Sequence, residues 1–211
     1  MRDHKIRGII FDLGNVLLDF NHMIAAEKLS GFTDKKGKEI YDLFFDSQKT
    51  QLFEEGKISA SEFFKGVKGM LNLKIPYEEF VPIWNGIFYF TDKNLQVYNL
   101  ARSLKTGYRL ALLTNINFLH LEHVKKIFPI LDAFHNILAS CELGLRTPQP
   151  EIYQKALEIL GTQAQETFYT DDRIELISGA KKLGINAVVF FGVEQLKKDF
   201  IAAGVNINWQ I

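Results

Sequence analysis

The stretch that decides the fold is Ile9-Ile10-Phe11-Asp12-Leu13-Gly14-Asn15-Val16-Leu17. It begins as an uninterrupted apolar run, which is typical of a strand buried on both faces of a parallel sheet. The run ends in a carboxylate, Asp12, which is followed by a glycine turn at Gly14. Open α/β sheets bind ligands outside the carboxyl ends of their strands. Asp12 is therefore well placed to act as a nucleophile or to hold a metal ion.

The rest of the chain alternates between strand and helix patterns. Apolar runs that predict buried strands lie at 7–12, 109–115, 167–171 and 187–192, with a weaker one at 136–140. Helical patterns lie between them at 92–105, 117–128, 150–160 and 174–183. A glycine follows three of these helices, where a left-handed terminus favours it. This alternation predicts an α/β fold, a doubly wound parallel sheet with a Rossmann-like core.

Residues 20–90 differ from this pattern. They contain no convincing strand and several amphipathic helical segments, one of which opens with the capping box Ser59-Ala60-Ser61-Glu62. We therefore expect a core made of residues 1–19 and 91–211 and an inserted all-helical cap made of residues 20–90. The aromatic residues Trp84, Phe88 and Phe90 could line a cap–core interface, a site entrance or a dimer contact, so the oligomeric state stays open.

Composition narrows the possible partners. The 211 residues include 25 basic and 25 acidic side chains, and this zero formal charge argues against nucleic acid as the main partner. No apolar run approaches the roughly 18 residues that a membrane span needs, and the charged start has no apolar signal segment behind it. The single cysteine, Cys141, fits a reducing cytoplasm and has no evident histidine partner that would activate its thiol.

Polar side chains end two of the later strands. Thr114-Asn115 follows Leu112-Leu113, and Asp171-Asp172 follows Tyr169-Thr170. Each pair has a simpler interpretation, because Thr114 or Asn115 could be a helix N-cap and Asp172 with Glu175 has the spacing of a capping box. However, adjacent carboxylates raise each other's pKa unless a metal or a base compensates.

In this order, Asp12, Thr114-Asn115 and Asp171-Asp172 resemble motifs one, two and four of the haloacid dehalogenase-like hydrolases. Residues 143–153, Leu-Gly-Leu-Arg-Thr-Pro-Gln-Pro-Glu-Ile-Tyr, resemble the third-motif region, which is usually Gly-x-Arg-Lys-Pro-x-x-x-Ile-Tyr. The start Asp-Leu-Gly-Asn-Val, the helical insertion and Gly56-Lys57-Ile58-Ser59 are most similar to the branch that contains bacterial glucose-1-phosphate phosphatase. The resemblance spans nearly the whole chain, and most members of this superfamily are magnesium-dependent phosphatases.

The resemblance also implies roles for the individual residues. Asp12 would attack phosphorus and form an aspartyl-phosphate. Mg²⁺ would lie between Asp12, the backbone carbonyl of Gly14 and Asp172, with Asp171 just outside the direct ligands. The Thr114-Asn115 segment, through the threonine and the Asn115 backbone, would hold a phosphoryl oxygen and orient it for in-line attack. The expected substrate is a small phosphorylated metabolite, for example a sugar phosphate.

Three positions depart from the family pattern. Gly14 replaces a second aspartate that usually acts as general acid, a role commonly worth a factor of about 10²–10⁴. Thr147 replaces a lysine that pairs with the nucleophile and the substrate phosphate. We expect Arg173 to supply this charge, with Arg146 as the second candidate; alternatively, Arg173 points into solvent. Leu176 replaces an Asn or Asp that supports the metal ligands, a loss of about 10–100-fold in metal affinity or activity.

These departures leave three functions open. The leading one is a cytoplasmic Mg²⁺-dependent phosphatase. The second is a metal-free dehalogenase in which Asp12 displaces halide by attack at carbon, although that branch normally retains the lysine that Thr147 replaces. The third is a non-catalytic protein that binds a phosphorylated ligand or a protein partner through the cap. We expect His120 and His123, three residues apart, to lie on a solvated helix face rather than to bind metal.

Overall fold

The computed structural model describes residues 5–45 and 47–207. Its centre is a five-stranded sheet in the order β5-β4-β1-β6-β7, and all of its neighbouring strands are parallel. The strands are β1 (Gly8–Phe11), β4 (Arg109–Thr114), β5 (Asn136–Ala139), β6 (Thr167–Asp171) and β7 (Asn186–Val189). The five predicted strands are present, although β7 begins and ends earlier than the predicted 187–192. Because β1 lies between β4 and β6, the residues that follow these three strands meet at one edge.

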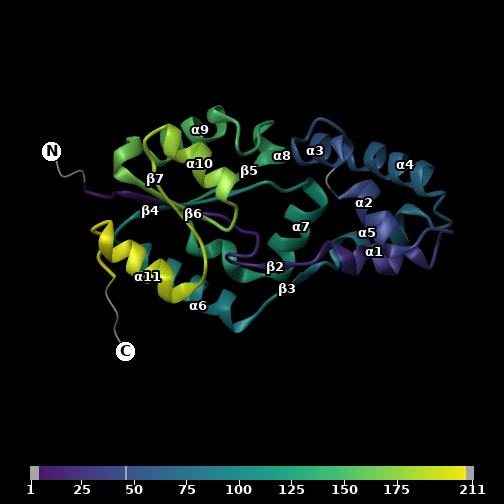
Figure 1. Ribbon diagram of the computed structural model, residues 1–211, viewed down its shortest axis with the longest axis horizontal. Helices are drawn as coiled ribbons and strands as arrows, with labels where there is room; N and C mark the ends of the chain where they lie inside the picture. The colour runs from purple at the N-terminus through teal and green to yellow at the C-terminus, as the bar shows by residue number, and fades with distance from the viewer. Residues whose placement is uncertain (1–4, 46, 208–211) are drawn as a thin grey trace.

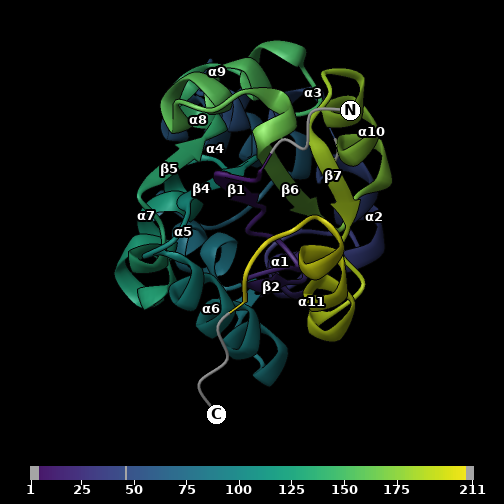
Figure 2. The same ribbon diagram turned by 90° about the vertical axis from the view of Figure 1, so that its left-hand side faces the viewer.

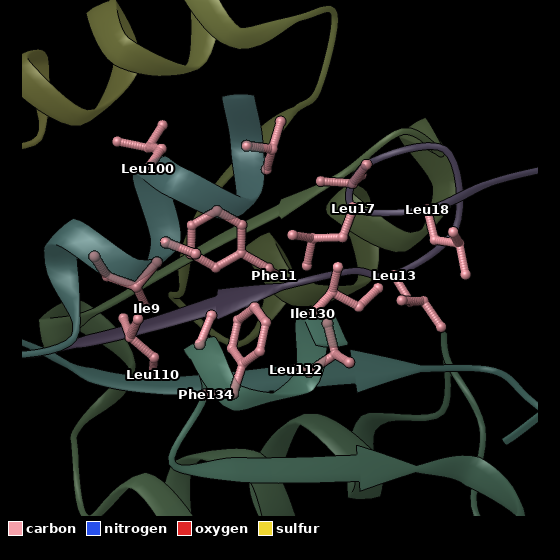
Figure 3. Close-up of a cluster of buried hydrophobic side chains, with 14 of the residues drawn as sticks. Ile9, Phe11, Leu13, Leu17, Leu18, Leu100, Leu110, Leu112, Ile130 and Phe134 are labelled. Atoms are coloured by element: carbon pink, nitrogen blue, oxygen red, sulfur yellow. The ribbon is translucent and has the colours of Figure 1, made fainter. Parts of the chain in front are cut away.

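Helices cover both faces of the sheet (Figure 2). The core helices are α6 (Asp92–Leu104), α7 (Phe118–Ile127), α8 (Ser140–Leu143), α9 (Pro150–Leu160), α10 (Ile174–Lys182) and α11 (Val193–Ala202), with 3₁₀ turns at η1 (Pro129–Ala133) and η2 (Ala164–Glu166). Side chains of a strand alternate between the two faces. Ile9 and Phe11 of β1 accordingly pack with Leu100 of α6 and Phe134 on one face (Figure 3), and Ile10 packs on the other face with residues of α9 and α10. The doubly wound α/β prediction is confirmed.

Five helices form a separate group at the right-hand end of the molecule in Figure 1. They are α1 (His22–Ser30), α2 (Gly37–Phe44), α3 (Gln48–Glu54), α4 (Ala60–Leu71) and α5 (Tyr77–Asn85), and we call them the cap. Trp84 is 1% exposed at the centre of the cap's own apolar cluster, packed between Phe63 and Phe80. The predicted capping box of Ser59 and Glu62 is confirmed, since it begins α4. Trp84 is thus buried in the cap, and its ring also stacks on His120 of α7, which places it at the contact between the cap and the core.

Two short strands, β2 (Asp19–Phe20) and β3 (Phe88–Tyr89), form an antiparallel pair where the chain enters and leaves the cap. The expectation that residues 20–90 contain no strand is therefore wrong at this pair, because two-residue strands are too short to show a hydrophobic alternation. Lys93 and Asn94 of α6 bind the Asp19 carboxylate and fix the pair to the core. Within the described residues, no helix has both the length and the apolar character that crossing a membrane requires.

The loop after α3 rests directly on the core. Gly56 has a left-handed backbone with φ +66°, and a Cβ at this position would lie 2.2 Å from the carbonyl oxygen of Cys141. Only glycine permits this approach without displacing the loop. Next to it, the Ser140 hydroxyl donates a hydrogen bond of 2.6 Å to the carbonyl oxygen of Glu54. The C-terminal end of α3 is therefore held against the carboxyl edge of the sheet.

Candidate active site

Asp12 lies at the centre of the carboxyl edge. It directly follows β1, and its backbone N–H donates to the carbonyl oxygen of Thr170 in β6 at 3.0 Å. On the other side, β4 pairs with β1 and ends at Thr114, which is 4% exposed. Parallel strands on both sides thus bring the ends of three predicted segments around one carboxylate.

Three carboxylates converge at this point. Oxygen atoms of Asp12, Asp171 and Asp172 all lie within 4.8 Å of one another. Burial raises the pKa of Asp12 well above its ordinary value, and the neighbouring charges of Asp171 and Asp172 raise it further. Burial also raises the pKa of Asp171 to about 6. Carboxylate oxygens are the ligands that Mg²⁺ prefers, and a divalent cation would favour the charged forms that burial and the neighbouring acids disfavour. The donor set therefore fits a hard divalent metal ion.

Side chains that the sequence analysis missed hold the two later acids in place. The Asn15 Nδ2 donates to Asp172 Oδ2 at 2.9 Å, and the Tyr169 hydroxyl donates to Asp171 Oδ2. Asn15 itself has φ +55°, and Lys93 Nζ donates to its carbonyl oxygen at 2.6 Å. Leu176 packs in the core, as its apolar side chain requires. Asn15 and Tyr169 therefore give the acid pair the kind of hydrogen-bonded support that Leu176 cannot provide.

The two helix-cap interpretations are wrong. Asn117, and not Thr114 or Asn115, caps α7, because its side chain accepts from the His120 N–H at 3.0 Å. Asp172 and Glu175 form no capping box, since the N-cap of α10 is Arg173 without a side-chain cap bond. Thr114, Asn115 and the acid pair are thus available for other roles at the sheet edge.

Asn115 grips the loop that lacks the family's lysine. Its Oδ1 accepts from the Thr147 N–H at 2.9 Å, and its Nδ2 donates to the Thr147 carbonyl oxygen at 3.2 Å. Thr147 is 3% exposed. The side chain of Asn115 therefore positions the third-motif loop, which leaves the Asn115 backbone for the phosphate contact that the resemblance implies.

Gly14 faces an aromatic ring. A Cβ at Gly14 would lie 2.7 Å from Cε1 of Phe20, and 3.6 Å from the Asp12 carboxylate. A second aspartate cannot fit at position 14 unless Phe20 moves. The absence of an acid at position 14 thus agrees with the packing of Phe20 against this position.

The two arginines proposed as substitute cations are both at the site. Arg173 lines a cavity that lies between the sheet edge and the cap. Its charge lowers the pKa of Asp12, although by less than burial and the acid pair raise that pKa. Its side chain is 54% exposed and its Nε donates to Glu175 Oε1 at 2.7 Å. Arg146 also lines the cavity, is 21% exposed, and pairs with Glu54 of the cap, with 3.2 Å between NH2 and Oε2. Arg173 thus fits both expectations, a cation at the site and a side chain in solvent, because it lines the cavity and is also exposed.

A cavity of about 250 Å³ lies between this edge and the cap. Gly14, Thr114, Asn115, Arg146 and Arg173 line its core side, and Phe20, Phe45, Gln51, Glu54 and Phe88 are among its other lining residues. A larger groove of about 820 Å³ lies at the opposite edge of the sheet, around Arg7 and Tyr108, far from the carboxylates. The smaller cavity is lined by Leu13 and Gly14, which directly follow Asp12, and so it lies beside the carboxylates.

His120 is not on a solvated face, and the expectation that it would be is wrong. It is 5% exposed and stacks on Trp84 with ring centroids 5.2 Å apart. The Asn117 Nδ2 donates to His120 Nδ1 at 3.0 Å, so Nε2 carries the hydrogen and donates to the Trp84 carbonyl oxygen at 3.1 Å. His123 is only partly exposed, beside Phe88. His120 joins α7 to the cap.

Cys141 is also buried, and burial raises the pKa of its thiol to about 11, which agrees with an unreactive cysteine.

The burial of His120 predicts acid-sensitive stability. Burial, followed by the nearby charge of His22, lowers the pKa of His120 to about 3 from an unfolded value of about 6.5. Between these values the unfolded chain binds a proton that the folded chain does not, so stability is complete above pH 6.5 and falls as pH decreases. The expected loss approaches about 1.4 kcal/mol per pH unit. Urea unfolding at pH 7.5, 6.5, 5.5 and 4.5 should show a steeper decline for the unmodified chain than for His120→Gln. Equal slopes would contradict the assignment.

This fold and site define a class: an α/β protein with a helical cap and three convergent acids at the carboxyl edge of its sheet. The pattern of the haloacid dehalogenase-like hydrolases matches residues 6–184, and the chain belongs to that family. The family predicted from the four motifs is confirmed, whereas the narrower likeness to glucose-1-phosphate phosphatase stays a prediction.

Two relatives of the chain are named as phosphatases. The chain is 26% identical over 185 residues to a D-ribitol-5-phosphate phosphatase from Bacteroides thetaiotaomicron, covering 85% of this chain and 89% of the relative. It is 28% identical over 199 residues to a glyceraldehyde 3-phosphate phosphatase from Pyrococcus abyssi, covering 88% and 81%. A crystal structure of a family enzyme from B. thetaiotaomicron, in complex with magnesium and inorganic phosphate, superposes with a TM-score of 0.75 at 27% identity, covering 87% of this chain and 93% of that one.

Proposed function

We propose that this protein is a Mg²⁺-dependent phosphatase that hydrolyses a small phosphorylated metabolite, such as a sugar phosphate, through an aspartyl-phosphate on Asp12. The observation that carries the proposal is the convergence of Asp12, Asp171 and Asp172 beside a cavity of about 250 Å³ under the cap. The phosphatase relatives and the magnesium and phosphate bound by a structurally similar enzyme support it. In this proposal residues 20–90 act as a cap domain over a core of residues 1–19 and 91–211.

Asp12, Asp172 and the carbonyl of Gly14 would hold the metal ion, with Asp171 behind them. The ion supplies positive charge that offsets the repulsion between a carboxylate nucleophile and a phosphate. Asp12 must be ionised to attack phosphorus, whereas burial and the two neighbouring acids favour its protonated form. The proposed nucleophile therefore depends on compensating positive charge.

We propose that Arg173 supplies part of this charge in place of the missing lysine, with Arg146 as second candidate. Arg173 is the cation whose charge lowers the pKa of Asp12. Thr114 and the Asn115 backbone would hold a phosphoryl oxygen and so orient phosphorus for in-line attack. No acid at position 14 can protonate the leaving oxygen, so substrates with a poor leaving group should react more slowly than those with a good one, such as an anomeric sugar oxygen. A dehalogenase is less favoured because Thr147 leaves that chemistry without its lysine.

The test is phosphate release from a panel of sugar phosphates and p-nitrophenyl phosphate, with Mg²⁺ and with a chelator. We expect turnover with Mg²⁺ that falls to background when the metal is removed. Arg173→Ala should lower kcat/KM by about tenfold or more, whereas Arg102→Ala, an exposed arginine on α6, should not. No Mg²⁺-dependent release from any substrate would favour the non-catalytic binding protein, for which phosphorylated ligands would raise the melting temperature without product.

A further inference from the structure

The cavity under the cap has two unlike walls. One wall is aromatic and includes Phe20, His22, Phe45 and Phe88, with the rings of His22 and Phe45 stacked 4.6 Å apart. The other wall is polar and includes Gln51 and Glu54 of α3 and Arg146 of the core. A site with one apolar side and a few polar groups holds a ligand in one orientation. If Arg173 serves the phosphate, the polar wall, which lies on the cap and the third-motif loop, would meet the leaving group of the substrate.

The pair between Glu54 and Arg146 dominates the polar wall. Its two charges cancel, and each side chain is only 21% exposed. The buried Nε of Arg146 has no hydrogen-bond partner within the described part of the chain. A second anion on the ligand would meet the Glu54 carboxylate, and a cation would meet Arg146. A hydroxyl can donate to the carboxylate and accept from the guanidinium at once, so the pair favours an uncharged, hydroxylated group.

The cavity of about 250 Å³ can hold a short hydroxylated chain. Its carbon-bound hydrogens would lie against the aromatic wall, and its hydroxyls would face α3. A purely apolar chain of the same length would displace the water that contacts the charged pair. It would offer no hydrogen bonds in place of that water, which is costly.

We propose that the Glu54–Arg146 pair determines substrate specificity by binding a hydroxyl on the leaving group of a short phosphorylated polyol or sugar. This inference rests on the proposed phosphatase function, but a phosphatase with another preference would leave that function intact. It assigns the polar face of α3 the task of selecting the leaving group, while Asp12 and its neighbours act on the phosphate.

The experiment compares two five-carbon monophosphates, D-ribitol 5-phosphate and n-pentyl phosphate, which differ in their hydroxyl groups. The unmodified enzyme should show a kcat/KM at least about 100-fold higher for ribitol 5-phosphate, because sites built to bind a hydroxyl reject analogues that lack it. Glu54→Gln, which removes the charge at nearly constant size, should reduce this ratio by at least about tenfold. The matched control Glu158→Gln removes an acid from an exposed ion pair on α9 and should keep the ratio.

Equal kcat/KM values for the two substrates, or an unchanged ratio in Glu54→Gln, would overturn the specificity proposal. Mg²⁺-dependent hydrolysis of p-nitrophenyl phosphate in the same experiment would show that the phosphatase proposal survives. If no substrate is hydrolysed, the proposal is tested by ligand binding, measured as a shift in melting temperature. Ribitol 5-phosphate should then raise the melting temperature more than pentyl phosphate does, and should do so less in Glu54→Gln, whereas equal shifts would reject the proposal.

Discussion

Asp12→Asn is expected to lose Mg²⁺-dependent phosphate release by at least about 10³-fold. Removal of a nucleophile typically costs several orders of magnitude in turnover, and an amide can neither attack phosphorus effectively nor bind a hard cation as a carboxylate does. The substitution also removes one of three clustered acids, and burial disfavours the charged form of this one. In chelator, the variant should therefore melt at the same temperature as the unmodified protein or higher.

The melting temperature separates a catalytic loss from an unfolded variant. Asp199→Asn, a surface aspartate whose Oδ1 accepts from Gln195 on α11, serves as the matched control and should retain full activity. Release by Asp12→Asn within tenfold of the unmodified rate would remove Asp12 as the nucleophile. The acid cluster predicts that Asp12→Asn is folded, inactive and at least as stable as the unmodified protein.

Asn15→Ala is expected to weaken Mg²⁺ binding by about 10–100-fold, the usual effect of losing a group that orients a metal ligand. The Asn15 amide donates to Asp172 at 2.9 Å, and Lys93 fixes the Asn15 backbone from the other side. Without the amide, the Asp172 carboxylate can rotate away from Asp12. Calorimetric titration with Mg²⁺, in the absence of substrate, measures the effect directly.

The left-handed backbone of Asn15 needs its own controls. Alanine at φ +55° costs roughly 1–2 kcal/mol regardless of any hydrogen bond. Asn15→Gly removes the amide without this strain and should bind Mg²⁺ as weakly as Asn15→Ala. Asn72→Ala places the same strain at φ +49° in the cap and should leave Mg²⁺ affinity unchanged. If Asn15→Gly bound Mg²⁺ as tightly as the unmodified protein, the hydrogen bond to Asp172 would have no such role.

The sheet and the meeting of its strand ends could be predicted from sequence, because both follow from local pattern and parallel topology. The apolar runs around Ile10, Leu112 and Phe168 are long enough to indicate buried strands, and parallel strands bring Asp12, Thr114 and Asp171 to one edge by geometry alone. The strand pair β2–β3 could not be predicted, since two residues carry no period.

Contacts between distant segments explain what the sequence did not reveal. His120 is buried by Trp84, which lies 36 residues earlier and reaches it only when the cap folds onto α7. Asn15 and Asp172 are 157 residues apart, and nothing in either local sequence indicates their hydrogen bond. The helix-cap interpretations of Asn115 and Asp172 failed for the same reason, because spacing describes only the neighbours along the chain.

The β2–β3 pair has a consequence for how this protein could diversify. Its two antiparallel strands bring the points where the chain leaves and rejoins the core next to each other. An insertion whose ends are adjacent can be lengthened, shortened or exchanged without altering the connectivity of the host sheet. The residues of the insertion, which would select a substrate, can then evolve independently of the core residues that would break its phosphate bond. The same active-site residues could thereby act on different substrates when only the inserted segment between β2 and β3 is replaced.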